Sequence, residues 1–238
     1  MEAFEAVLNR IKYPGRGIMI GVTPDKRSAV IVYFLSGRSQ NSRNRILVSD
    51  EDGIHTEPFD PEKLEDPSLI IYDPIRSYGD YTIVTNGDQT STIYSGLQEG
   101  RSFELSLSMR SFEPDAPIYT PRISALLNIL GGNVKLKMSS IHVIAGNPFF
   151  SAHDIYDYPE IPPGCGYFLR TYIDDGSPLQ AYTDPPVKVS ITSSDLYLSS
   201  DHFWESLNKE NRISLFIRMI DLQSGSKRDR IINRYPEQ

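Results

Sequence analysis

Apolar residues fall in short blocks along the chain, and Gly, Pro, Asn or Asp separates one block from the next, which favours a strand-rich fold. Residues 17–22 and 29–35 are almost wholly apolar and are joined by a turn at 23–26, so they predict a hairpin of buried strands. Similar blocks predict further strands at 46–49, 68–72, 81–85, 135–145, 166–173, 187–192 and 213–222.

Other segments predict helices, at 1–12, 99–112, 122–130 and 201–208. The first has its apolar residues at helical spacing. Residues 99–112 fit both a strand and a helix, and the capping residue Ser102 favours the helix. The apolar residues of 122–130 also follow helical spacing, and Gly131-Gly132 supplies a C-terminal stop.

The order of these elements predicts a layered α+β or α/β architecture in one domain, residues 1–238. A chain of this length buries enough surface to fold without a disulfide or metal staple. Residues 148–164 are rich in Pro, Asp and Tyr and are expected to form one long ordered loop. Strand-rich folds with such loops often assemble further, so a homo-oligomer stays an open expectation.

The charge balance argues against several partners. With 24 basic and 31 acidic residues, the net charge is −7 and the isoelectric point is about 5.1, which is unsuited to non-specific binding of nucleic acid or an anionic membrane. No stretch approaches the ~20 apolar residues of a membrane span. The N-terminal residues lack the basic and apolar regions of a signal peptide, so a cytoplasmic location is expected.

Cysteine and histidine give no sign of a metal centre. The single cysteine, Cys165, excludes an intramolecular disulfide and a multi-cysteine metal site, and we expect it to be a structural thiol. The histidines are scattered without ligand spacing, and His142 lies in an apolar pattern typical of a core position. No metal and no cofactor are therefore expected.

The basic residues are unevenly chosen and placed. The chain has 16 arginines and 8 lysines, and Arg38, Arg43 and Arg45 lie within eight residues. No acidic residue occurs in this loop or in the predicted strands on either side of it. Arginine forks beside Ser and Asn donors suit a phosphate, so residues 37–45 predict an anion site. The alternative is a solvated loop, and the Walker A pattern is absent.

Three other loops carry polar residues next to predicted strands. Residues 13–17 form a turn with two glycines that presents Tyr13 and Arg16, and glycine allows a close approach to a ligand. Residues 72–76 and 86–90 each follow a strand and supply carboxamides and hydroxyls suited to reading a base or carboxamide edge. Each segment by itself is also typical of a plain turn.

The segment that starts at Glu113 predicts a helix start. Thr120 is a candidate N-cap, Pro121 suits the first helical position, and Arg122 would lie in the first turn. A cation is unfavourable there because the helix dipole is positive at that end, so Arg122 is expected to serve a ligand. The alternative is an ion pair between Arg122 and Glu113 or Asp115.

Together these motifs resemble the archaeal-type IMP cyclohydrolases and their bacterial relatives over residues 13–123. The matching segments are YPGRG, GRSxNSRNR, IxYDPIR, VTNGDQT and ExDAPxYTPRI, in that order. The resemblance implies an α+β fold similar to the N-terminal-nucleophile hydrolases, a four-layer helix/sheet/sheet/helix sandwich. Met1-Glu2 offers no Ser, Thr or Cys nucleophile, so a self-processing amide hydrolase of this fold is not expected.

The resemblance also implies a reaction, the closure of the second purine ring. The carboxamide nitrogen of 5-formamidoimidazole-4-carboxamide ribonucleotide attacks the formyl carbon, and loss of water gives inosine monophosphate. Such a reaction requires alignment of two groups, proton transfer and stabilisation of an oxyanion. The alternative is a non-catalytic purine-nucleotide-binding or regulatory protein of the same fold.

On this hypothesis, residues of the matching segments take particular roles. Nine residues are expected to bind the substrate. Arg16, Arg38, Ser39 and Arg45 would hold the phosphate, and Asn86 and Thr90 would orient the carboxamide. The other three are Tyr13, Asn44 and Thr120. Tyr72 and Glu113 are the proton-transfer candidates. Arg122 is expected to position Glu113 or to polarise the formyl oxygen.

Overall fold

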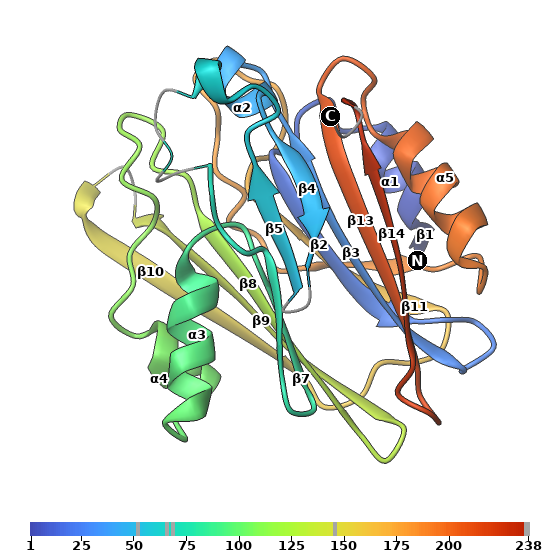
Figure 1. Cartoon of the computed structure of the whole chain (residues 1–238). Coiled ribbons are helices and arrows are strands. Elements are labelled where there is room, and N and C mark those ends of the chain that lie inside the picture. The colour runs from blue at the N-terminus through green and yellow to red at the C-terminus, as the bar shows by residue number, and fades with distance from the viewer. Residues whose placement is uncertain (51–52, 65–66, 68–69, 145–146, 236–238) are drawn as a thin grey trace.

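Two seven-stranded sheets packed face to face form the body of the protein (Figure 1). The computed structural model describes residues 1–50, 53–64, 67, 70–144 and 147–235. Helices lie on the outer sides of the sheets, and the expected α+β class is confirmed. None of the described helices is long and apolar enough to cross a membrane.

Sheet A contains the predicted apolar hairpin at its centre. Its strands, in spatial order, are β1 (Glu2–Ala3), β12 (Val187–Ser190), β11 (Cys165–Arg170), β2 (Arg16–Val22), β3 (Ser28–Ser36), β13 (Arg212–Asp221) and β14 (Lys227–Asn233). Every residue of β2 and β3 is buried, because one face of the sheet packs on helices and the other on sheet B. This double burial explains their continuous apolar runs.

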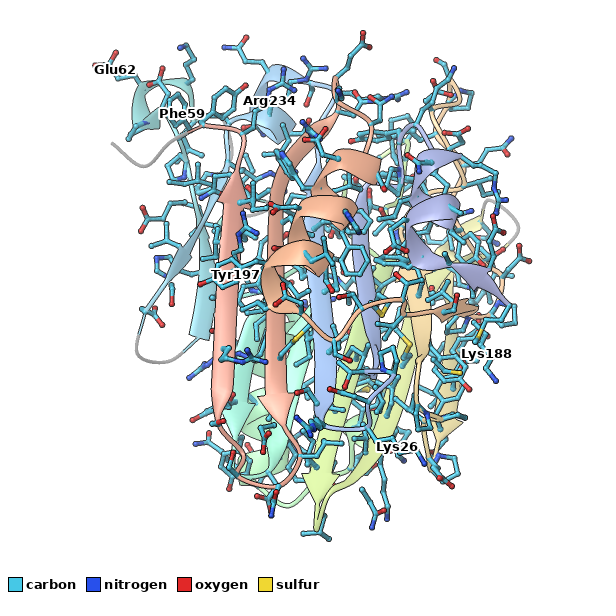
Figure 2. All side chains as sticks on the ribbon, turned by 90° about the vertical axis from the view of Figure 1, so that its right-hand side faces the viewer. Lys26, Phe59, Glu62, Lys188, Tyr197 and Arg234 are labelled. Atoms are coloured by element: carbon cyan, nitrogen blue, oxygen red, sulfur yellow. The ribbon has the colours of Figure 1, made fainter. Side chains whose placement is uncertain are left out.

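Sheet B is an antiparallel meander. Its strands, in spatial order, are β10 (Asn147–Tyr158), β9 (Asn133–Ile144), β8 (Arg122–Leu130), β7 (Tyr81–Thr85), β6 (Ile75–Tyr78), β5 (Gly53–Glu57) and β4 (Ile46–Ser49). At one side of the sandwich, the Asn233 carboxamide bonds both backbone groups of Leu47, at 3.0 and 2.9 Å, and joins β14 to β4. The ring of Phe59, which is labelled in Figure 2, stacks on that of Tyr235 with the ring centroids 4.5 Å apart.

The helices cover the two outer faces. Helices α1 (Phe4–Asn9) and α5 (Leu196–Ser206) lie over sheet A, which Figure 2 views from that side. Helices α3 (Gln89–Gln98) and α4 (Phe103–Leu107) pack on sheet B. The short α2 (Gln40–Arg43) lies in the loop between β3 and β4. A single 3₁₀ turn, η1, occupies Pro61–Lys63.

The largest apolar cluster lies between the sheets. Side chains at alternate positions of β2, including Ile18 and Ile20, face this core, while Met19 faces the helices. Arg16 is in phase with Ile18 and Ile20. The strand period therefore directs an arginine into the space between the sheets, at one end of the core.

The helix predicted at 122–130 is wrong, because these residues form β8. Residues 122–127 are buried, since Ile123, Ala125 and Leu127 face sheet A while Leu126 faces α3 and α4. The Gly131-Gly132 pair is a two-residue hairpin turn with φ of 58° and 80°, a conformation that favours glycine. The proposed N-cap of Thr120 and the dipole argument for Arg122 are withdrawn with the helix.

Two other predicted elements differ from the structure. Most of 148–164, expected as a loop, belongs to the edge strand β10, which pairs with β9 along nearly its whole length. Of the strand expected at 68–72, residues 68–69 lie outside the described residues. Residues 70–72 are not in a strand, although the Tyr72 carbonyl accepts from the Thr56 amide at 3.0 Å.

The other predicted elements are found with shifted ends. Ser102 caps α4 as expected, accepting a hydrogen bond from the Leu105 amide at 3.2 Å. The helix expected at 201–208 begins earlier, at Leu196. Cys165 is a buried free thiol at the start of β11. Pattern reasoning did not predict α3, β5, β6 or β14.

Candidate active site

A cavity of about 270 Å³ opens at the end of the sandwich where Arg16 enters the inter-sheet space. It lies where the start of β2, the arginine-rich loop before β4, the loop before β8 and the segment after β11 meet. Six of the predicted site residues line it: Tyr13, Arg16, Arg38, Ser39, Arg45 and Glu113. Segments far apart in the sequence thus supply one site.

Gly15 brings the backbone of the Tyr13–Arg16 turn against β11. Its φ is 74°, and a Cβ atom there would lie 2.1 Å from Oγ1 of Thr171. That hydroxyl accepts a hydrogen bond from the Arg16 amide at 3.1 Å. A residue with a side chain at position 15 would separate the two segments and displace Arg16.

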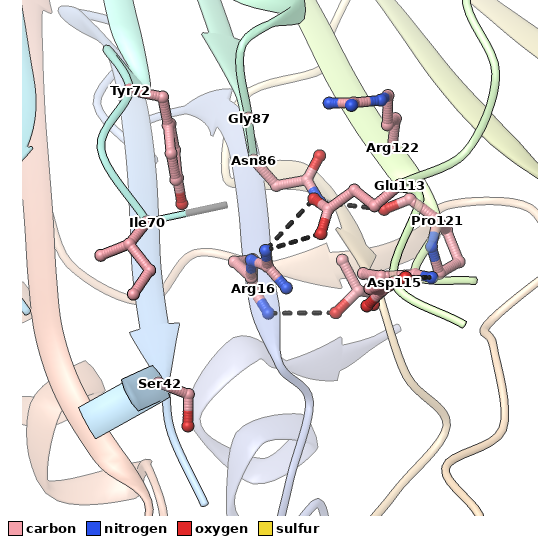
Figure 3. A network of polar contacts seen from close by, with 12 residues as sticks. Arg16, Ser42, Ile70, Tyr72, Asn86, Gly87, Glu113, Asp115, Pro121 and Arg122 are labelled. Atoms are coloured by element: carbon pink, nitrogen blue, oxygen red, sulfur yellow. Dashed lines mark hydrogen bonds and ion pairs between the residues drawn. The ribbon is translucent and has the colours of Figure 1, made fainter. Parts of the chain in front are cut away.

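Arg16 and Glu113 form a buried ion pair, shown in Figure 3. Nη2 of Arg16 donates to Oε1 and Oε2 of Glu113 at 3.1 and 3.0 Å. Both side chains are nearly inaccessible, with 11% and 3% exposed. The Glu113 amide donates to the Thr120 carbonyl at 2.9 Å, and this bond closes the loop that carries the carboxylate.

Burial sets the electrostatics of this pair. It raises the pKa of the Glu113 carboxyl above its ordinary value, although Arg16 and Arg122 act in the opposite direction. Burial also disfavours the Arg16 cation, but Glu113 and the nearby tyrosines together outweigh it and hold the pKa of Arg16 well above its usual value. Arg16 therefore stays charged, and Glu113 is a carboxylate whose proton affinity is increased.

Carboxamides hold Glu113 from the other side. Nδ2 of Asn86 donates to Oε1 of Glu113 at 3.2 Å, and Oδ1 of Asn86 accepts from the Ile123 amide at 2.8 Å. Gln89 donates to the same Oδ1 at 2.8 Å and accepts from Nη1 of Arg122 at 2.9 Å. Arg122 therefore acts on Glu113 through Gln89 and Asn86.

The fit around Gly87 gives a test of this network. A Cβ atom at Gly87 would lie 2.8 Å from both Nη1 of Arg122 and Oε1 of Gln89. We expect Gly87→Ala to lower the free energy of unfolding by about 1–3 kcal/mol, because overpacking must move these buried groups. Urea unfolding measures the change against Ser91→Ala, an exposed substitution in α3, the helix that follows. Equal stability of the two variants would contradict the packing described.

The arginine-rich loop lies at the other end of the cavity and is internally braced. Ser39 caps α2, since its hydroxyl accepts from the Ser42 amide at 3.1 Å, while Oγ of Ser42 accepts from the Arg38 and Ser39 amides, both at 2.9 Å. Nε of Arg45 donates to the Ser42 carbonyl at 3.0 Å. These bonds fix where the guanidinium groups lie.

The arginines of this loop stand apart from the described carboxylates. In the part of the chain that the structure describes, no carboxylate forms an ion pair with Arg38, Arg43 or Arg45. Arg45 is only 3% exposed, and a buried cation without a counter-charge is costly. A bound anion would supply that charge. Among the same residues, no group of three or more His, Cys, Asp or Glu side chains could hold a metal ion.

Tyrosines lie in the cavity wall and close behind it, and Tyr13 and Tyr172 belong to the lining. The hydroxyl of Tyr72 lies 2.7 Å from that of Tyr33, which burial keeps protonated by raising its pKa well above the ordinary value. In Figure 3 the Tyr72 hydroxyl points toward the space beside Arg16. Tyr13 stacks on Tyr172 with ring centroids 5.7 Å apart.

Three predicted residues have structural partners outside the cavity. The Asn44 carboxamide bonds both backbone groups of Asp60, at 2.8 and 2.7 Å. Thr90 shares a hydrogen bond of 2.6 Å with Thr85. Arg122 pairs with Asp88 at 2.5 Å, so the alternative of a direct ion pair with Glu113 or Asp115 is not found.

Thr120 is buried behind the cavity lining, where it bonds the lining residues Asp115 and Tyr172. Sequence reasoning did not include Asp115, Tyr172 or Tyr33 among the site residues. Asp115 lies inside the ExDAPxYTPRI motif, which is a signal that could have found it. Tyr172 and Tyr33 occur in no polar motif, and only the order of strands in sheet A brings Tyr172 to the cavity and Tyr33 close to it.

The chain belongs to the family of IMP cyclohydrolase-like proteins, whose family model matches residues 13–225. The family expected from the sequence motifs is thus confirmed, and the match extends through the C-terminal half.

Individual relatives match shorter segments. Over 120 residues the chain is 29% identical to the IMP cyclohydrolase of Methanothrix thermoacetophila and, over a similar stretch, 32% identical to that of Methanocella arvoryzae. Each match covers 49% of the chain and 58% of the relative. The IMP cyclohydrolase of Methanosphaera stadtmanae is 26% identical over 164 residues, 67% of the chain and 73% of the relative. The chain thus spans only about 58% of the first two relatives' length.

Proposed function

We propose that the protein is an IMP cyclohydrolase, which converts 5-formamidoimidazole-4-carboxamide ribonucleotide into inosine monophosphate and water. One observation carries the proposal. A single cavity has arginines with no acidic partner among the described residues at one end and the buried Arg16–Glu113 pair at the other. The first end suits a phosphate, and the second suits proton transfer on an uncharged ring. The names of the relatives point to the same reaction.

The substrate would span the cavity between these two ends. Arg38, Ser39 and Arg45 receive the 5′-phosphate, because guanidinium forks bind phosphate oxygens in pairs. The imidazole then reaches Glu113. This placement holds the carboxamide and formyl groups of one molecule together, and such alignment removes much of the entropic barrier.

Glu113 serves as the base in the ring-forming step. The carboxamide nitrogen attacks the formyl carbon while Glu113 accepts one of its protons, and a carbinolamine forms. Arg16 keeps its charge and stabilises the negative charge that develops on the formyl oxygen. Asn86 holds the carboxylate in place from the opposite side.

Loss of water completes the reaction. Glu113 returns its proton to the oxygen and takes the proton of the formamido nitrogen as the carbon–nitrogen double bond forms. The C–O bond breaks, and the leaving hydroxyl takes this second proton from Glu113 and departs as water, which returns Glu113 to its ionised form. The Tyr72 hydroxyl, near Arg16, is the second group that could relay a proton in this step. No covalent intermediate with the protein is required.

We further propose that the fold is the four-layer arrangement of the N-terminal-nucleophile hydrolases. The packing of α1 and α5 on sheet A, and of α3 and α4 on sheet B, supports four layers. The site proposed here uses Glu113 and not an N-terminal nucleophile. An experimental structure superposed on that hydrolase class would test the assignment.

An assay that follows the absorbance of inosine monophosphate tests the proposed function. The purified protein should form it above the uncatalysed rate, and Arg38→Ala should raise KM because a phosphate ligand is lost. Tight binding of inosine monophosphate without turnover would favour the non-catalytic nucleotide-binding alternative. If the protein showed no turnover and no binding, both the enzymatic and the nucleotide-binding function would be refuted.

The pH dependence of kcat/KM should report the buried carboxyl. Glu113 accepts a proton only when ionised, and burial raises its pKa, so activity should fall as pH decreases through a value above about 4.3, the ordinary pKa of glutamate. The same profile measured on Glu113→Gln should lack this limb. A limb at or below the ordinary glutamate range would contradict the assignment.

A further inference from the structure

Tyr172, just after β11, belongs to the cavity wall but to none of the roles described above. It is 3% exposed, and its ring stacks on Tyr13 with an angle of 14° between the planes. The guanidinium of Arg38 lies 4.8 Å above the other member of this pair, Tyr13. The wall therefore runs from Arg38 through two stacked aromatic rings toward Asp115.

A chain of hydrogen bonds fixes the Tyr172 hydroxyl. Its oxygen lies 2.5 Å from Oγ1 of Thr120, and that threonine hydroxyl donates to Oδ2 of Asp115. The Thr120 amide donates to the other carboxylate oxygen, at 2.7 Å. Both Asp115 oxygens therefore act as acceptors.

The directions of these bonds follow from proton counting. A hydroxyl has one proton to donate, and that of Thr120 is used on Asp115. The bond between Thr120 and Tyr172 must then be donated by Tyr172. Burial raises the pKa of Tyr172 to about 12, so this proton is present at neutral pH. The Tyr172 oxygen has no further proton to donate, but it can still accept a hydrogen bond.

We propose that Tyr172 accepts a hydrogen bond from a ribose hydroxyl of the bound nucleotide, and that Thr120 and Asp115 orient it for this role. The proposal rests on the proposed function, which puts phosphate at Arg38 and the base near Glu113. Tyr172 lies along the wall between these ends, where the ribose of such a ligand lies. An acceptor at this position distinguishes a ribose from a deoxyribose, which lacks the hydroxyl that donates the hydrogen bond.

Calorimetric titration with inosine monophosphate and its 2′-deoxy and 3′-deoxy analogues tests the proposal. The wild-type protein should bind the ribonucleotide about 3- to 10-fold more tightly than at least one analogue, the range of one neutral hydrogen bond. In Tyr172→Phe the preference should fall below about twofold through weaker binding of the ribonucleotide alone. Tyr167→Phe, on β11 and outside the cavity lining, is the matched control and should keep the wild-type preference.

Thr120 is a positioning residue in this proposal. Thr120→Val removes the acceptor for the Tyr172 proton while keeping the shape of the side chain, so the ribose preference should fall. Thr120→Ser retains the hydroxyl and should restore it. A purely structural role would lower stability or overall affinity without changing the ratio between ribose and deoxyribose ligands.

The outcomes separate this inference from the proposed function. Equal affinity of the wild-type protein for all three ligands, or an unchanged preference in folded Tyr172→Phe, would overturn the inference while leaving ring closure intact. Ribose preference without turnover would sustain the inference and refute the enzymatic function. No binding of inosine monophosphate would overturn both.

Discussion

Glu113→Gln is expected to lower kcat by about 10²- to 10⁴-fold, the usual contribution of a general base. Glutamine retains the shape and an oxygen that can accept from Arg16 and Asn86, but it cannot take a proton from the carboxamide nitrogen. The loss should appear in kcat with little change in KM, because Glu113 acts at the reacting atoms. Steady-state kinetics with the formamido ribonucleotide measures both.

The matched control for this variant is Glu99→Gln. Glu99 follows α3 on the surface and pairs there with Arg101. The Glu99→Gln variant should therefore retain the wild-type kcat. Circular dichroism and unchanged affinity for inosine monophosphate would show that Glu113→Gln is folded. A folded Glu113→Gln variant with wild-type kcat would exclude Glu113 as the base.

Arg45→Met is expected to raise KM by about 10- to 100-fold with a much smaller effect on kcat. Arg45 is nearly buried and has no ion-pair partner among the described residues, so its charge is available to a phosphate. A charge-assisted hydrogen bond is worth about 1.5–3 kcal/mol, which gives this range. Methionine fills the space of the side chain and leaves no buried charge unpaired.

Two comparisons make this prediction specific to the phosphate. Arg10→Met removes an exposed arginine paired with Glu2, and it should leave KM unchanged. Inosine, which lacks the phosphate, should bind the wild-type protein weakly and lose little further affinity in Arg45→Met. If the variant weakened inosine and inosine monophosphate by the same factor, Arg45 would not be the phosphate ligand.

The sequence predicted the apolar strands of sheet A well because burial on both faces makes them continuously apolar. The same double burial misled the prediction at 122–130, where an unbroken apolar run also fits helical spacing. The prediction of a loop in place of the edge strand β10 was wrong for the opposite reason. Much of it is exposed, so its sequence needs no apolar alternation and resembles a loop.

Helix α3 was missed because its buried face has little apolar character. Gln89, Thr90, Ile93 and Gly96 form that face, and only one of them is a large apolar residue. A Cβ atom at Gly96 would lie 1.9 Å from Oγ of Ser106, so the helix packs there through the absence of a side chain. Hydrophobic spacing cannot reveal such a contact.

The candidate site was predictable where polar residues cluster in loops. The arginine-rich loop, Arg16 and Glu113 were found in this way, and the cavity brings them together. Tyr172 of the lining and Tyr33 behind it were not, because each lies in or next to a strand and is positioned only through pairings distant in sequence. The ion pair of Arg122 with Asp88 was not predicted, since it follows from the pairing of β7 with β8.

A single-turnover measurement tests most directly the claim that Glu113 closes the purine ring. The protein is mixed in excess with the formamido ribonucleotide, the reaction is quenched at intervals, and inosine monophosphate is quantified, which separates chemistry from binding and product release. The account predicts exponential product formation well above the uncatalysed rate, slowed about 10²- to 10⁴-fold in Glu113→Gln. Product formation at the uncatalysed rate from a bound substrate, or at equal rates in the two proteins, would contradict it.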